Sequence, residues 1–250
     1  MTADRVVVIT GGTRGWGRAI AMRYAEPGTS LVLNFVRDAE AAAETASAVA
    51  ALGADVALVQ SDIATAAGVG AVLAAARELG RVDVLVHNAF LAATARPLEV
   101  SDDVFDAVMA VGPKALLAML RGGVELFPDD GGHVVCTLSL ATKRIFNKRG
   151  TNYFPMAAAK AALEVCVQYL AVDLAPRSIT VNGVAAGFFA DEAVTAETSD
   201  PFRASIASKT PLGRIPATRE VADVVHFLGS SAGGWVTGQV LVADGGFSLI

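Results

Sequence analysis

The chain has 250 residues, of which 53% are hydrophobic and 18% charged, and its formal net charge is −5. Such a chain can bury a large apolar core, which excludes a wholly disordered protein. Its net negative charge gives no sign of the basic surface that nucleic-acid-binding proteins use. Two cysteines are too few for a disulfide framework. No signal-peptide-like stretch opens the chain, and charged residues interrupt the alanine-rich stretches before about 18 apolar residues. We therefore expect a cytoplasmic protein without a membrane span.

Short apolar runs alternate with helical patterns along the whole chain. The apolar runs predict strands at 6–9, 31–35, 54–60, 82–87, 133–139, 178–184 and 239–243. Helical patterns follow the glycine cluster at 10–17 and occupy 38–52, 65–80, 101–110, 114–127, 155–174 and 218–229. The strands are apolar throughout, which is typical of a parallel sheet that is covered on both faces. The alternation predicts a doubly wound α/β fold with a seven-stranded parallel sheet, as one dinucleotide-binding and catalytic domain over 1–250.

The glycine cluster Thr10-Gly-Gly-Thr-Arg-Gly-Trp-Gly17 directly follows the first predicted strand. Gly11 permits a tight turn, and the missing side chains let the backbone approach a pyrophosphate. The following helix offers free N–H groups at its N-terminus. The alternative is a plain tight turn, but the strand–turn–helix context favours a dinucleotide site. We assign to it Gly11, Thr13, Arg14, Gly15, Trp16 and Gly17.

The end of the second predicted strand indicates which cofactor binds. An NAD site places a carboxylate there for the ribose 2′-hydroxyl, whereas this chain has Asn34-Phe-Val-Arg37. Arg14 and Arg37 are placed to approach a 2′-phosphate, which arginine binds bidentately. We therefore expect NADP(H), with Asn34 and Arg37 at the site; the alternative is that both arginines are ordinary surface residues.

Motifs spread over the full length of the chain resemble those of the short-chain dehydrogenase/reductase family. They are the glycine cluster, Ser61-Asp62-Ile63, His87-Asn88-Ala89, Ser139, Lys160-Ala-Ala-Leu, Asn182-Gly-Val-Ala-Ala-Gly187 and Asp244-Gly245-Gly246. The resemblance implies a single-domain Rossmann fold, with Asp62 and Ile63 beside the adenine, and Asn88, Ala89 and Gly187 at the cofactor cleft. His87 and Phe90 depart from the Asn-Asn-Ala-Gly pattern of the family. We interpret His87 as a hydrogen-bonded structural residue.

The catalytic region departs from the common family motif Tyr-x-x-x-Lys. Met156 stands four residues before Lys160, and Tyr153 stands seven before it. This spacing resembles the enoyl-thioester reductases of the family, in particular the NADPH-type enoyl-[acyl-carrier-protein] reductase III. The resemblance implies that Tyr153 and Lys160 are catalytic and that Ser139 supports them. Hydride transfer to the β-carbon leaves charge on the thioester oxygen, which lies farther from the hydride-accepting carbon than the oxygen of a ketone does. The stabilising hydroxyl must therefore stand at a different place relative to the nicotinamide than in a carbonyl reductase.

Two further departures bear on the substrate. Gly112, within Val111-Gly-Pro113, stands where the family has an asparagine, and the absence of that asparagine argues against ordinary ketoreduction. The alternative is that the Gly-Pro pair simply breaks the helix into two. A basic loop at 142–150 suits a phosphopantetheine arm, CoA or an acidic carrier protein, and equally suits a solvated loop.

The stretch 187–210 lies beyond the carboxyl ends of the predicted strands, where we expect a substrate lid. Residues expected to line the substrate pocket are Phe90, Met156, Phe188 and Phe189. We expect an acyl thioester on acyl carrier protein or CoA as substrate, in fatty-acid or polyketide biosynthesis. A homotetramer built through 114–127 and 155–174 is expected, a dimer being the second choice, with no metal. The alternatives are a carbonyl (3-oxoacyl or polyketide) reductase and a non-catalytic nucleotide-binding homologue.

Overall fold

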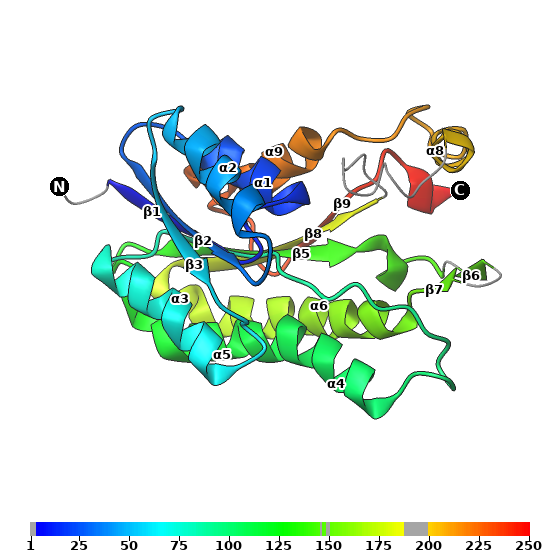
Figure 1. Ribbon diagram of the computed structural model, residues 1–250, viewed down its shortest axis with the longest axis horizontal. Helices are drawn as coiled ribbons and strands as arrows, with labels where there is room; N and C mark the ends of the chain where they lie inside the picture. Colours follow the sequence, from blue (N-terminus) through cyan, green and yellow to red (C-terminus); the bar gives the residue numbers. More distant parts are fainter. Residues whose placement is uncertain (1–3, 146, 149–150, 188–199) are drawn as a thin grey trace.

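The computed structural model describes residues 4–145, 147–148, 151–187 and 200–250. Its centre is a seven-stranded parallel sheet in the order β3-β2-β1-β4-β5-β8-β9 (Figure 1). The strands are β1 Arg5–Ile9, β2 Thr29–Phe35, β3 Asp55–Gln60, β4 Val84–His87, β5 Gly132–Ser139, β8 Ile179–Ala186 and β9 Val240–Ala243. The strand order reverses direction between β1 and β4, which creates the crevice where open α/β sheets bind ligands. The predicted fold class is confirmed.

Helices cover both faces of the sheet (Figure 1). One layer contains α1 Gly15–Tyr24, α2 Ala39–Ala50 and α9 Thr218–Leu228. The other contains α3 Ala66–Glu78, α4 Asp102–Met109, α5 Ala115–Gly123 and α6 Phe154–Leu174. Each layer encloses its own hydrophobic cluster against the sheet. Because both faces are covered, every residue of the interior strand β2 is buried, whereas the edge strand β3 has exposed positions.

The predicted break at Gly112-Pro113 is a π-helical turn, Ala110–Lys114, between α4 and α5. Gly112 has non-helical backbone angles (φ −86°, ψ −108°), and Pro113 has no N–H to donate. The carbonyl of Gly112 lies 3.0 Å from Nε2 of His87 at the end of β4. The turn is therefore tied to the centre of the sheet.

Helix α6 is the longest in the described part of the chain. The stretch Phe154–Arg177 is long and apolar enough, by length and composition alone, to cross a membrane. Its buried residues Ala159, Leu163, Val167 and Ala171 recur every four positions, and α6 packs on β5 and β8. That packing is the arrangement of a helix that covers a sheet.

Two elements lie where the sequence predicted irregular chain. A short hairpin of β6 Asn147–Lys148 and β7 Thr151–Asn152 falls at the end of the basic loop. Helix α8, Asp200–Ala207, falls within the expected lid 187–210. Residues 188–199 of that lid, with Phe188 and Phe189, lie outside the described residues.

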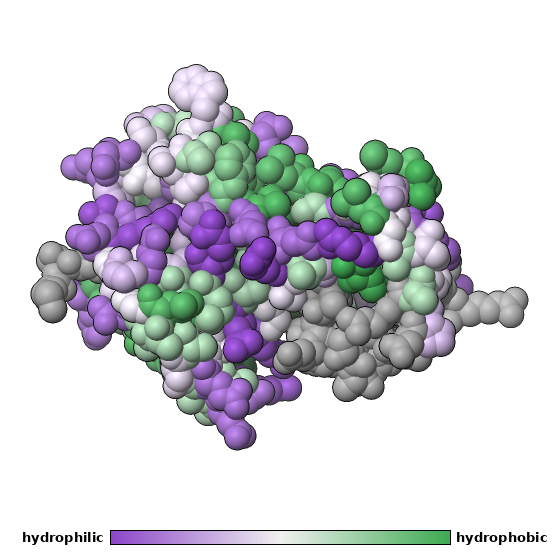
Figure 2. All heavy atoms as spheres, turned by 90° about the horizontal axis from the view of Figure 1, so that it is seen from above, coloured by the Kyte–Doolittle hydropathy of each residue, from purple (hydrophilic) through white to green (hydrophobic). Residues whose placement is uncertain are grey.

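The surface is uneven in character. Figure 2 looks onto the layer of α1, α2 and α9 and shows mainly hydrophilic atoms over the left and centre. Hydrophobic atoms gather toward the right, the end at which Figure 1 places the C-terminus. Leu249 and Ile250, at the C-terminus, are exposed apolar residues. So is Leu212, whose amide donates to the carbonyl of Gly245 near the C-terminus.

Candidate active site

The turn between β1 and α1 depends on glycines. Gly11 (φ 61°) and Gly15 (φ 52°) adopt the left-handed conformation that disfavours other residues. A Cβ atom at Gly17 would overlap the carbonyl oxygen of Gly11. The three glycines therefore permit a tight turn with α1 packed directly against it.

The N-terminus of α1 lacks the side-chain cap that each of the next three helices has. Side chains of Asp38, Thr65 and Ser101 cap α2, α3 and α4 by accepting a backbone N–H. At α1 the N-cap residue is Arg14, with no side-chain cap and no acidic residue in the first turn. The uncapped N–H groups and the helix dipole suit the pyrophosphate of a dinucleotide.

Asn34 supports this turn from the neighbouring strand. Its Nδ2 donates to the carbonyl of Ser61 (2.9 Å), and its Oδ1 accepts the amide of Gly11 (3.4 Å). The side chain is buried and its polar atoms are engaged within the protein. We therefore interpret Asn34 as holding the glycine turn against β3 rather than as reading the cofactor directly.

Asn88 and Ala89, beyond the end of β4, hold the turn from the other side. Asn88 Nδ2 donates to the carbonyls of Thr10 (3.1 Å) and Gly11 (3.0 Å). The hydroxyl of Thr10 accepts the amides of Asn88 (2.9 Å) and Ala89 (3.0 Å). The structure thus brings Asn88 and Ala89 to the glycine turn at the switch point of the sheet, where the resemblance implied the cofactor cleft.

The side chains expected at the adenosine end are mostly exposed. Arg14 and Arg37 reach solvent, and neither forms an ion pair with the residues that the structure describes. Asp62 is exposed at the end of β3, where its carboxylate accepts the amide of Ala64 (2.9 Å). Ile63 is buried in the core. Two cationic side chains thus remain available for a 2′-phosphate.

The remaining predicted cofactor residues have structural contacts. Thr13 is buried, and its carbonyl accepts the hydroxyl of Thr45 (2.8 Å). Trp16 is half-buried and packs on the core beneath α1. Gly187 follows β8, where its amide donates to the carbonyl of Ala243 (3.3 Å).

Lys160 is the buried cation of the site, with only 5% of the residue exposed. Its Nζ donates to the carbonyl of Thr137 (2.6 Å), near the end of β5. Burial lowers the pKa of Lys160 from 10.5 to about 8, because an apolar environment disfavours the ammonium. An ammonium carries three donors, and Thr137 takes one, so Lys160 suits the hydroxyls of a nicotinamide ribose.

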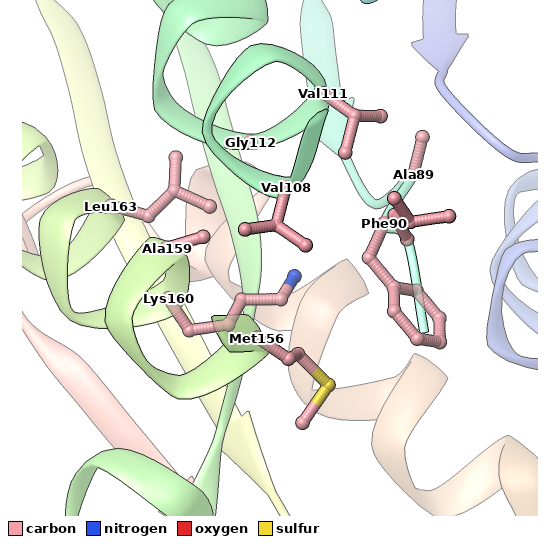
Figure 3. A pocket seen from close by; sticks show the side chains of 10 residues that line it. Ala89, Phe90, Val108, Val111, Gly112, Met156, Ala159, Lys160 and Leu163 are labelled. Carbon is pink, nitrogen blue, oxygen red and sulfur yellow. The ribbon is translucent and has the colours of Figure 1, made fainter. Parts of the chain in front are cut away.

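An apolar pocket adjoins Lys160 (Figure 3). It encloses about 230 Å³ of empty space, including its opening to solvent, between α4, the π-helical turn, α6 and the chain after β4. Its lining is Ala89, Phe90, Leu91, Val108, Val111, Gly112, Met156, Ala159, Lys160 and Leu163. Phe90 and Met156, which we expect to line the substrate pocket, both line this one, and the Phe90 ring centroid lies 5.6 Å from Nζ of Lys160. One cation in an apolar wall suits an acyl chain beside a polar reacting group.

Tyr153 and Ser139, the other two predicted catalytic residues, are not among the residues that line this pocket. Tyr153 is the N-cap residue of α6, is half-buried, and forms an isolated backbone bridge with Ala95. Helix α6 begins at Phe154, one residue before the predicted start at Pro155, so Tyr153 lies immediately ahead of the helix. Ser139 ends β5, and its hydroxyl accepts the amide of Ala141 (3.1 Å). The structure therefore brings Lys160, Met156 and Phe90 together at one pocket, whereas Tyr153 and Ser139 lie outside its lining.

His87 is a structural residue in this arrangement. The imidazole is fully buried, and burial, followed by the charge of Lys160, lowers its pKa to about 3. Both effects favour the neutral imidazole. Its contact with Gly112 holds the floor of the pocket.

Comparisons with known proteins identify the family. Residues 11–248 match a family model described as "Enoyl-(Acyl carrier protein) reductase". The chain belongs to the short-chain dehydrogenase/reductase family of oxidoreductases. It is 32% identical to 1-cyclohexenylcarbonyl-CoA reductase of Streptomyces collinus, over 100% of this chain and 89% of that protein. It is 32% identical to NADPH-dependent aldehyde reductase 2, chloroplastic, of Arabidopsis thaliana, over 99% and 95% of the two chains.

Solved structures of the family share the same fold. The short-chain dehydrogenase/reductase from Serratia marcescens BCRC 10948 superposes with a TM-score of 0.89 at 29% identity, over 99% of both chains. The angucycline C-6 ketoreductase LanV with bound NADP gives a TM-score of 0.89 at 28% identity, over 100% of this chain and 97% of that one. Within the described residues, no cluster of three or more metal-ligating side chains is found.

The basic loop of this family member is partly engaged by its own chain. Lys143 pairs with Glu164 on α6 (2.7 Å). Arg144 donates to the carbonyl oxygen of Phe247 (2.9 Å) in the C-terminal turn. These two cations therefore serve internal contacts, which weakens the expectation that they receive a carrier.

Proposed function

We propose that this protein uses NADPH to reduce the carbon–carbon double bond of an enoyl thioester carried by acyl carrier protein or CoA. One observation carries the proposal. The side chain one helical turn before Lys160 on the pocket wall is Met156, which has no proton to donate. The tyrosine nearest in sequence, Tyr153, stands ahead of the helix. The description of the family model and the printed name of the Streptomyces collinus relative support the same chemistry.

The residues of this chain divide the chemistry between them. When bound, NADPH would supply a hydride to the β-carbon of the enoyl group, and a proton from solvent would complete the reduction at the α-carbon, which leaves NADP⁺ and the saturated thioester. Lys160, which is buried with one donor engaged by Thr137, would hold the ribose hydroxyls of the bound cofactor. Tyr153 donates a hydrogen bond to the thioester oxygen, where negative charge develops, and Ser139 supports it. The apolar walls contributed by Phe90 and Met156 hold the acyl chain.

The preference for NADPH rests on Arg14 and Arg37. Both are exposed, and neither is paired with a carboxylate of the described chain, so both are free to bind a 2′-phosphate. A family neighbour of similar fold holds NADP, and a relative is named as NADPH-dependent, which supports this choice.

A carbonyl reductase is the second candidate, because several relatives are named as aldehyde reductases or ketoreductases. The two activities separate when NADPH oxidation is followed with crotonyl-CoA and, in parallel, with acetoacetyl-CoA. We expect crotonyl-CoA to be the better substrate, with butyryl-CoA identified by mass. Turnover of acetoacetyl-CoA alone would replace the proposal with ketoreduction. Tight NADPH binding with neither substrate reduced by a folded enzyme would favour a non-catalytic homologue.

We further propose a homotetramer, with a dimer as second choice. The outer face of α6 exposes Val165, Tyr169 and Val172, spaced as one apolar stripe of the helix. Sedimentation of the wild type should give an oligomer at micromolar concentration, and Tyr169→Asp should shift it toward smaller species. Asp173→Asn, an exposed polar control on the same helix, should leave the oligomer unchanged. A monomeric wild type would refute the assembly.

A further inference from the structure

A third, small hydrophobic cluster lies apart from the two main ones. It contains Leu140, Ile206 and Phe247, all nearly fully buried, with Ile215 packed against them. Leu140 directly follows Ser139, Ile206 lies on α8, and Phe247 begins the C-terminal 3₁₀ turn, Phe247–Leu249. Figure 1 places α8 and the C-terminus together at one end of the molecule. The cluster therefore joins three segments that no strand pairing joins among the described residues.

The C-terminal turn has a fixed shape. The carboxylate of Asp244 accepts the amides of Gly246 (2.8 Å) and Ser248 (2.7 Å). Gly245 (φ 64°) and Gly246 (φ 86°) adopt left-handed conformations. The two acceptor oxygens and the two glycines thus specify one conformation, from which Phe247 enters the cluster.

This turn packs closely against the chain that leaves α8. A Cβ atom at Gly245 would lie 2.7 Å from Thr210 Cγ2, and one at Gly246 would lie 2.9 Å from Pro211 Cγ. The amide of Leu212 also donates to the carbonyl of Gly245 (3.2 Å). The glycines are needed here for close approach as well as for conformation.

The same turn holds the ends of two sheet strands. A Cβ atom at Gly187, after β8, would lie 3.3 Å from both Asp244 Cβ and Leu140 Cδ1. Arg144, shortly after β5, donates to the carbonyl oxygens of Phe247 (2.9 Å) and Ile250 (2.5 Å). Its guanidinium lies 5.0 Å from the centroid of the Phe247 ring. The segments that leave β5, β8 and α8 therefore converge on one turn.

We infer that Arg144, Asp244 and Phe247 form a C-terminal clasp that positions the turn after Ser139 and helix α8 for the thioester. The ends of β5 and β8 belong to the carboxyl edge of the sheet, where open α/β folds bind their ligands. The clasp residues are positioning residues, because each acts on Ser139 or α8 through another group. The identity of the ligand in this inference rests on the proposed function, whereas the contacts of the clasp do not depend on it.

The chain offers a matched pair of variants for the test. Phe247→Ala removes a ring that is 6% exposed, and Leu249→Ala removes an apolar side chain that is 85% exposed in the same turn. Phe247→Leu is the conservative variant that keeps an apolar group in the cluster. Hydrogen exchange of α8 (200–207) is compared with that of α3 (66–78) as an internal reference. NADPH affinity by fluorescence titration and the KM and kcat for crotonyl-CoA complete the readouts.

We expect Phe247→Ala to lower exchange protection in α8 by about tenfold or more and to leave α3 unchanged, because the loss is local. KM for crotonyl-CoA should rise by about tenfold, while the NADPH Kd stays within about twofold, because the glycine turn is untouched. Leu249→Ala should match the wild type, and Phe247→Leu should lie between the two.

Unchanged α8 protection in folded Phe247→Ala, or an equal effect of Leu249→Ala, would overturn the clasp. If Phe247→Ala does not fold, Asp244→Asn tests the same turn, because it weakens two amide contacts without removing volume. A wild type that does not reduce crotonyl-CoA would refute the proposed substrate and leave the exchange test to decide the clasp. Loss of protection with unchanged KM would overturn the positioning role.

Discussion

The cofactor half and the substrate half of this site are built differently. The turn between β1 and α1 is held by polar contacts from the two neighbouring strands, through Asn34 on β2 and Asn88 after β4. The substrate half combines a π-helical turn, the start of α6 and a C-terminal turn, which are distant in sequence. Three of the departures from the family motifs, Gly112, Met156 and Phe90, line the pocket of the substrate half. Cofactor binding and substrate choice should therefore respond separately to mutation.

The largest expected effect falls on the substrate half alone. Tyr153→Phe removes one hydroxyl and little volume, and loss of an oxyanion donor lowers kcat by about 10²–10³. The NADPH Kd should stay unchanged, because the phenol does not hold the dinucleotide. Stopped-flow turnover of crotonyl-CoA beside fluorescence titration of NADPH checks both. Near-normal turnover in this variant would show that Tyr153 is not the donor.

Met156→Tyr sharpens the same point. It restores the spacing of a carbonyl reductase on the pocket wall beside Lys160. We expect loss of enoyl reduction and at best traces of keto reduction, since the hydroxyl would stand at the wrong oxygen. Met156→Leu keeps an apolar side chain and should mainly change KM. Full enoyl activity in Met156→Tyr would break the link between spacing and substrate.

Lys160 joins the two halves, and its titration should be visible in stability. Burial holds its folded pKa at about 8, below the ordinary 10.5, so the unfolded chain binds more protons between these values. The free energy of unfolding should therefore rise with pH across that window, by up to about 3 kcal/mol at 1.36 kcal/mol per unit. Urea unfolding of the cofactor-free wild type against Lys160→Met checks it, since the variant should lack this rise. A parallel pH dependence in both proteins would contradict the assignment.

Gly17 tests the cofactor half with a control on another helix. Gly17→Ala places a methyl group against the carbonyl of Gly11 and should cost about 1–3 kcal/mol of stability, with weaker NADPH binding. Gly70→Ala on α3 meets nothing within 4 Å and should stabilise the protein by up to about 1 kcal/mol. Thermal unfolding and NADPH titration measure both. A neutral Gly17→Ala would mean that the turn relaxes, so that the tight approach is not required.

The two halves also differ in how far the sequence predicts them. Apolar strands and the glycine cluster carry strong local signals, and Gly112-Pro113 predicts the break between α4 and α5 that the structure shows. Helix α8 carries no such signal, because it is short and Ile206 is buried only through the third cluster. The two-residue strands β6 and β7 are too short to show a period.

The polar contacts behind the site are also invisible in the sequence. Thr10 lies beside Asn88 because β1 and β4 are paired, and Thr137 meets Lys160 because α6 packs on β5. Asn34 was predicted from its position at the end of β2, and its inward contacts depend on the neighbouring β3. Motif spacing therefore predicts which residues gather at the carboxyl edge, while the direction of each side chain depends on tertiary packing.

The smallest effect should come from the exposed arginines of the cofactor half. Arg37→Ala should weaken NADPH binding by about tenfold, the scale of one charged hydrogen bond, and leave NADH binding unchanged. The loss should shrink at high salt, because Arg37 is exposed and its interaction is screened. Arg121→Ala removes the same charge from the exposed side of α5 and should not discriminate between the cofactors. Titration of both cofactors at two salt concentrations separates a local phosphate contact from a general charge effect.

If Arg37→Ala weakens the binding of NADPH and of NADH equally, or if Arg121→Ala has the same effect, the phosphate assignment fails. If only the variant that also carries Arg14→Ala loses the preference, the two arginines share the phosphate.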